Sequence, residues 1–92
     1  MKSIITQEPG TCFLCGSTWN LEDHHIFCGK NRKLSEKYGL KVRLCPYCHR
    51  DGKAGVHADA KKAEQLHRIG QQAFETRFPE KNFRAIFGKN YL

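Results

Sequence analysis

Four of the five cysteines in this 92-residue chain form two Cys-x2-Cys pairs, Cys12 with Cys15 and Cys45 with Cys48. Two thiolates with this spacing on a tight turn can reach one ion, and two such turns complete the tetrahedron that structural zinc prefers. A chain of this length buries only about 60 to 70% of its unfolded surface, so a metal ion would add much to its stability. The sequence therefore predicts one small domain over residues 1–92, built around a four-cysteine zinc site.

Other uses of the cysteines are weaker interpretations. An odd cysteine count argues against a secreted disulfide scaffold, whereas buried or redox-active thiols without metal stay an alternative. We expect the unpaired Cys28, like Trp19, to lie in the core. The first nine residues lack the apolar core of a signal peptide, and no apolar run approaches membrane-spanning length. We therefore expect a cytoplasmic protein with no membrane partner.

Histidines gather around the two cysteine pairs. The pairs are 29 residues apart, more than a simple zinc ribbon needs, and the adjacent His24 and His25 lie in this spacer. Neighbours on a strand point to opposite faces, so one imidazole can bind a metal while the other faces elsewhere or reaches a substrate. His49 directly follows the second pair, and His57 lies eight residues beyond it. This convergence favours a second site over two surface histidines on a polar strand.

Positive charge is concentrated beside these motifs. The chain has a formal charge of +7, and residues 30–53, with eight basic and two acidic side chains, carry +6 of it. A polyanion would meet this charge close to the predicted metal ligands, which indicates nucleic acid as a partner. An ordinary solvated basic surface is the alternative.

The middle of the chain predicts a hairpin. Residues 21–27 suggest a strand, although their apolar positions alternate poorly. Residues 41–44 alternate charged and apolar side chains and predict a second short strand that leads into the second cysteine pair. Residues 28–39 are predicted to form a long polar loop between the two strands.

The last third of the chain predicts two helices. Apolar residues recur with a helical period over residues 60–78, after Asp59 as a cap. Pro79 is expected to end this helix and to begin a shorter one that closes at Gly88. His67 borders the apolar face of the longer helix, so we expect it to pack. This segment, residues 59–92, supplies packing surface.

Taken together, three motifs resemble the HNH endonucleases of the ββα-metal (His-Me finger) class. They are Cys12-Phe13-Leu14-Cys15, Asp23-His24-His25-Ile26 and Leu44-Cys45-Pro46-Tyr47-Cys48-His49, in the family's order, and they cover about residues 12–57. The resemblance implies a small, metal-stapled α+β fold: a ββα-metal hairpin and helix with four-cysteine zinc knuckles, followed by the C-terminal helices.

The resemblance also implies a role for each histidine. His25 matches the general base that activates water, while His24 and His49 match ligands of a catalytic metal. The family's third ligand position falls on Lys53, so His57 is the candidate replacement. The metal would be a divalent ion, Mg²⁺, Mn²⁺, Ni²⁺ or Zn²⁺, separate from the structural Zn²⁺.

A second departure from the family pattern concerns a residue that supports the hairpin loop. The family's central asparagine falls on Leu40, so either Asn31 steadies the hairpin loop or the loop is held in another way. Asp23 is a candidate second-shell acceptor for a histidine, or a ligand itself. Phosphate contacts that do not read bases are expected from five basic residues, Lys30, Arg32, Lys33, Lys41 and Arg43.

By this resemblance the chain would be a metal-dependent endonuclease acting on DNA, with double-stranded DNA as its partner. The small stand-alone form of the chain resembles HNH proteins encoded by phages and mobile elements, which implies a bacterial or phage-infected cell. A zinc module that binds nucleic acid without cleaving it is the alternative function, and a structural zinc domain that binds proteins is a more distant one. Protein partners are not predicted.

Overall fold

A two-stranded antiparallel sheet lies at the centre of the molecule. The computed structural model describes residues 2–5 and 10–92. Strand β1 (Glu22–His25) pairs with β2 (Lys41–Leu44), so that His24 lies opposite Val42 and His25 opposite Lys41. The predicted small α+β fold is confirmed, and β2 has its predicted bounds. β1 is shorter than predicted, because the chain leaves the sheet after His25.

The segment between the strands is helical, so the predicted polar loop was wrong. A 3-10 turn, η1 (Gly29–Asn31), leads into helix α1 (Arg32–Tyr38). Helix α1 buries Ser35 and Tyr38, which are three residues apart and therefore share one face. Because only two positions of this helix are buried, its apolar residues do not recur with a helical period clear enough to be recognised in the sequence.

Ser35 fastens the connection between the strands. Its hydroxyl accepts a hydrogen bond from the Phe27 N–H at 3.0 Å and donates one to the Phe27 carbonyl at 2.8 Å. Asn31 instead donates its side-chain amide to the Phe87 carbonyl at 3.0 Å, which ties η1 to the C-terminal region. Leu40 is fully buried. The connection is therefore held by Ser35 rather than by an asparagine.

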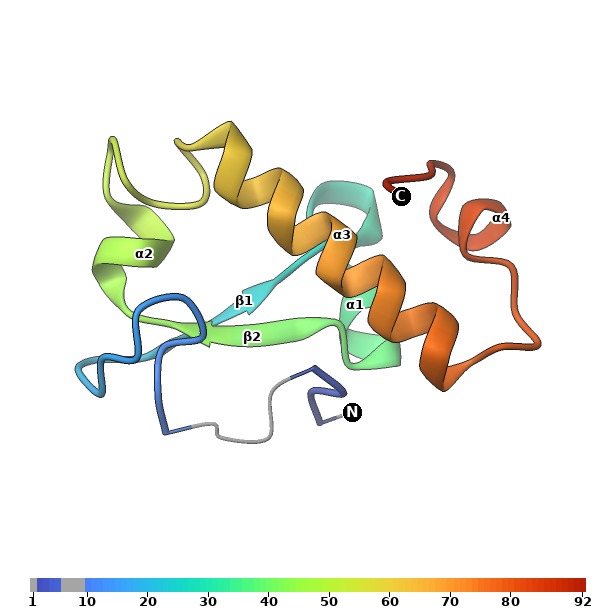
Figure 1. The fold of residues 1–92 in the computed structure, drawn as a ribbon, viewed down its shortest axis with the longest axis horizontal. Coiled ribbons are helices and arrows are strands. Elements are labelled where there is room, and N and C mark those ends of the chain that lie inside the picture. The colour runs from blue at the N-terminus through green and yellow to red at the C-terminus, as the bar shows by residue number, and fades with distance from the viewer. Residues whose placement is uncertain (1, 6–9) are drawn as a thin grey trace.

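Helix α3 (Ala60–Arg77) crosses the sheet, as Figure 1 shows, and its predicted bounds are confirmed to within one residue. The Asp59 side chain accepts hydrogen bonds from the backbone N–H groups of Lys61 and Lys62, as the predicted cap requires. Among residues 2–5 and 10–92, no helix combines the length and apolarity needed to cross a bilayer.

Helix α4 (Phe83–Phe87) starts later than predicted. Its cap is Asn82, whose side chain accepts from the Ala85 N–H at 3.1 Å, so the prediction of a start at Pro79 was wrong. Gly88 ends the helix with a left-handed φ of 84°, as predicted. Both Phe83 and Phe87 are buried.

The core is aromatic and centres on Phe27. Its ring is stacked on His67 with centroids 5.4 Å apart, and it contacts Phe83, Phe87 and Tyr91. The packing role predicted for His67 is confirmed. The expectation of a buried Trp19 and Cys28 was wrong, because Trp19 is 64% exposed and Cys28 is also exposed.

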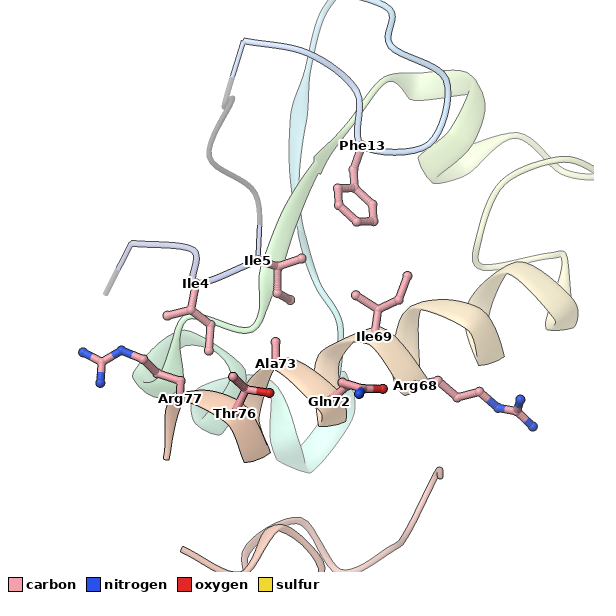
Figure 2. Close-up of a pocket in the computed structure, with 9 residues that line it drawn as sticks. All are labelled: Ile4, Ile5, Phe13, Arg68, Ile69, Gln72, Ala73, Thr76 and Arg77. Atoms are coloured by element: carbon pink, nitrogen blue, oxygen red, sulfur yellow. The ribbon is translucent and has the colours of Figure 1, made fainter. Parts of the chain in front are cut away.

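An open groove runs between the N-terminal segment and α3. Figure 2 shows Ile4, Ile5 and Phe13 facing Ile69 and Ala73 of that helix. The backbone of this segment is anchored where the Ile4 N–H donates to the carbonyl of Gly39 at 2.9 Å. Ile4 and Ile5 are therefore held beside the hairpin and α3.

Candidate metal centres

The four paired cysteines converge in space. The sulfur atoms of Cys12, Cys15, Cys45 and Cys48 all lie within 4.8 Å of one another. Three of these residues are buried, and Cys15 is exposed. Four sulfurs gathered in this way are the donor set of a closed structural zinc site, so the cluster can hold a structural metal such as zinc.

Local backbone geometry brings each pair to this cluster. In the first knuckle Gly16 has a left-handed φ of 79°, and its N–H donates to the Cys12 carbonyl at 2.9 Å. The Phe13 N–H donates to the carbonyl of Arg43 at 2.8 Å, which fixes this knuckle to the end of β2. The second pair opens helix α2 (Pro46–Arg50), with Cys45 as its N-cap. Both turns therefore meet at one end of the hairpin.

The thiols of the cluster differ in acidity. Burial raises the pKa of Cys12, but backbone hydrogen bonds, led by that with Cys45, outweigh it and lower the pKa to about 6. Burial, together with the neighbouring thiols, raises the pKa of Cys48. Four thiolates so close together repel one another, and a divalent cation would favour the deprotonated form of all four.

Three histidines form a second cluster. The ligand nitrogens of His24, His49 and His57 lie within 4.8 Å of one another. Ring centroids are 5.2 Å apart for His24 and His49, 5.3 Å for His24 and His57, and 5.0 Å for His49 and His57. His24 is buried, whereas His57 is exposed. Three imidazoles gathered in this way could hold a metal ion.

The loop before α3 brings His57 back to the other two rings. The Asp51 carboxylate accepts hydrogen bonds from the backbone N–H groups of Lys53 and Ala54 at 3.0 and 2.9 Å. A Cβ at Gly55 would lie 2.6 Å from the backbone nitrogen of Asp51, so this tight turn requires glycine. The Val56 N–H then donates to the Cys48 carbonyl at 2.8 Å. The chain thus returns to α2 one residue before His57.

Burial keeps one of the three rings neutral. Burial first, then the neighbouring His49 and His57, lowers the pKa of His24 to about 3. A neutral imidazole has a nitrogen lone pair, which is the form that binds metal. At neutral pH His24 therefore already has the protonation state of a ligand.

Glu22 is a supporting residue that the sequence reasoning missed. Its carboxylate lies 2.8 Å from Nδ1 of His49 and accepts from Arg50 at 2.7 Å. The bond with His49 is the main reason why the pKa of Glu22 is lowered. A bond from Nδ1–H to a carboxylate leaves Nε2 for a metal and fixes the ring, as is usual for histidine ligands. Strand alternation was the available signal, because it places Glu22 on the face of His24.

Asp23, the candidate acceptor for a histidine or ligand, lies outside the histidine cluster. Its carboxylate pairs with Arg43 across the sheet at 2.9 Å. The next cross-strand pair on this face is His25 and Lys41. Nε2 of His25 and Nζ of Lys41 each lie 2.9 Å from a carboxylate oxygen of Glu36.

The predicted phosphate contacts fall into two groups. Lys41 and Arg43 form ion pairs on the sheet, as just described, which engages both of their charges within the protein. Lys30, Arg32 and Lys33 are exposed on η1 and the first turn of α1. This second group is exposed to solvent close to the strand that carries His24 and His25, and the Arg43 side chain is also 41% exposed despite its ion pair.

The sequence matches no protein-family model, no curated protein and no solved structure at a significant level. Function is therefore inferred from the chemistry of the two clusters and of their surroundings.

Proposed function

We propose that the protein is a metal-dependent endonuclease that hydrolyses phosphodiester bonds in DNA. One observation carries the proposal: three imidazoles converge on an open donor set, and a fourth, His25, follows one of them directly on β1. His25 is not one of the three clustered histidines, so its ring is not committed to that ligand set and can serve as a base. Phosphodiester hydrolysis requires both a base and a cation.

His25 would act as the general base. Its ring would take a proton from water, and the resulting hydroxide would attack phosphorus while the bond from phosphorus to the leaving oxygen breaks. A neutral imidazole suits this step because its ordinary pKa lies near neutral pH. The leaving oxygen would then gain a proton from solvent.

His24, His49 and His57 would bind one divalent ion, which when bound supplies positive charge to the phosphate and the leaving oxygen. The exposed Lys30, Arg32 and Lys33 would contact phosphates on either side of the scissile bond, giving affinity without base selection. The four-cysteine cluster would hold a structural Zn²⁺ and take no part in the chemistry.

A zinc module that binds nucleic acid without cleaving it is the second candidate. Trp19 and Tyr47 favour it, because they lie in or beside the two knuckles and are 64% and 62% exposed. Exposed aromatic rings beside basic residues can stack on unpaired bases. This candidate predicts salt-sensitive binding to single-stranded DNA and no strand cleavage with any added divalent metal ion.

Plasmid cleavage tests the proposal. Purified protein is incubated with supercoiled plasmid and Mg²⁺, Mn²⁺, Ni²⁺ or Zn²⁺, beside His25→Ala and the matched control His67→Gln, whose histidine packs on Phe27. We expect wild type and the control to nick or linearise the plasmid, and His25→Ala to be at least about 100-fold slower. Intact plasmid with wild type in every metal, or equal cleavage by His25→Ala, would overturn the proposal.

A further inference from the structure

We infer that Glu36 is a positioning residue for His25: it holds the proton of the neutral ring on Nε2, so that Nδ1 is the nitrogen that accepts the proton from water. The inference rests on the proposed function for the identity of the base. The tautomer itself is a property of the folded protein and can be measured without any cleavage.

Among the residues that the structure describes, Glu36 is bonded to one residue on each strand. One carboxylate oxygen lies 2.9 Å from Nε2 of His25, and the other lies 2.9 Å from Nζ of Lys41. His25 and Lys41 face one another across the sheet, so a single side chain from α1 bridges both strands. The His25 side chain is 12% exposed and that of Glu36 is 47% exposed, so the ring is largely covered while water reaches the carboxylate.

The direction of the His25 bond follows from the charge of Glu36. Hydrogen bonds from Lys41 first, and then from His25, lower the pKa of Glu36 to about 2. An ionised carboxylate only accepts hydrogen bonds, so Nε2 must be the donor. In a neutral imidazole the lone pair then belongs to Nδ1, as in other sites where a carboxylate sets the tautomer of a base.

The backbone around Glu36 is held in place independently. The neighbouring Ser35 forms two hydrogen bonds with Phe27, which is two residues beyond His25. Lys41 fixes the second carboxylate oxygen and so restricts rotation of the group. The bond between Glu36 and His25 thus joins two segments whose separation is already set, which is the condition for orienting a catalytic group.

Nitrogen-resolved NMR of the imidazole rings tests the inference. Spectra are recorded on zinc-loaded protein at about pH 8.5, two units above the ordinary imidazole pKa, where neutral rings dominate. We expect a proton on Nε2 of His25 in wild type and a mixture of both tautomers in Glu36→Ala. In Glu36→Gln the side chain has a single oxygen, and the Lys41 ammonium, which can only donate hydrogen bonds, requires it as acceptor. The amide NH₂ therefore faces Nε2 of His25. Nε2 must then accept a hydrogen bond, so the ring proton moves to Nδ1.

A second variant separates this account from a general loss of structure. Adding Lys41→Met to Glu36→Gln releases the amide oxygen, so the His25 proton should shift back toward Nε2. Glu64→Gln is the matched control: it breaks the exposed ion pair with Arg68 on α3 and should leave the His25 tautomer unchanged. A wild-type proton on Nδ1, or the same tautomer in wild type, Glu36→Ala and Glu36→Gln, would overturn the inference.

Cleavage kinetics give an independent readout. Glu36→Gln should lower kcat by at least about 10-fold with little change in KM, because it alters the base and not substrate binding. An unchanged kcat together with an inverted tautomer would also count against the assignment of Nδ1. If wild type does not cleave DNA at all, the proposed nuclease fails, while the NMR result still decides whether Glu36 sets the tautomer.

Discussion

The Nδ1 atom of His49 lies 2.8 Å from a carboxylate oxygen of Glu22, although the two residues are 27 positions apart in the chain. One belongs to α2 and the other to β1, so this bond joins the helix that the second cysteine pair opens to the first strand. His25 has a comparable carboxylate partner in Glu36 at 2.9 Å. Two histidines with different proposed roles are therefore each oriented by a glutamate.

Glu22→Gln should weaken metal binding at the histidine cluster by about 10- to 100-fold, because His49 loses the carboxylate that orients it. Zinc at the cysteines should be unaffected. Calorimetric titration of protein already holding one zinc measures the second site directly. The control Glu64→Gln breaks only an exposed ion pair on α3. Equal affinities for wild type and Glu22→Gln would show that Glu22 does not support a ligand.

Substitution in the cysteine cluster should unfold the protein. Metal binding at a four-thiolate site is worth on the order of 10 kcal/mol, comparable to the whole stability of a small domain. We expect Cys48→Ser to abolish both zinc retention and cooperative unfolding, as measured by metal analysis and circular dichroism. Cys28→Ser is the matched control, because Cys28 is exposed and outside the cluster. A folded, zinc-free Cys48→Ser protein would contradict the structural role.

The sequence predicted those features that depend on short-range pattern. Cysteine spacing predicted the convergence of the four sulfurs, charged and apolar alternation predicted β2, and Asp59 with its helical period predicted α3. The sequence also singled out His57 as the candidate third ligand, and the structure places it beside His24 and His49.

What could not be predicted depends on how distant segments meet. The pairing of Glu22 with His49 requires the register of β1 and the position of α2 together. The pairing of Glu36 with His25 requires a helix in a segment whose polar composition suggested a loop. Carboxylates are common on protein surfaces, so neither glutamate stands out until its partner is placed.

Close packing of α3 on the end of β1 makes Gly70 sensitive to substitution. A Cβ there would lie 3.0 Å from both Ile26 and Phe27, and Phe27 is fully buried among aromatic rings. Gly70→Ala should therefore lower stability by about 1 to 3 kcal/mol, despite the better helix propensity of alanine. Gly52→Ala, where a Cβ meets nothing within 4 Å, is the control and should be neutral. Denaturant unfolding compares the two, and a gain in stability for Gly70→Ala would contradict this packing.

The buried His24 predicts how stability changes with pH. Its pKa falls from 6.5 to about 3 on folding, so below pH 6.5 the unfolded chain binds a proton that the native protein does not. Stability is therefore lost as pH falls through 6.5 and continues to fall until about 3. Between about pH 7.5 and 5.5 the His24 side chain alone should lower the free energy of unfolding by about 1.4 kcal/mol.

That loss is measured with protein loaded with one equivalent of zinc, whose unfolding is monitored by circular dichroism at several pH values in this range. His24→Gln should show a smaller decrease than wild type, because glutamine does not titrate. Gln65→Ala, an exposed and uncharged change on α3, should keep the wild-type pH dependence. If His24→Gln and wild type lose the same free energy of unfolding between the two pH values, His24 is not held neutral by the fold. Its readiness to bind a metal at neutral pH would then need another cause.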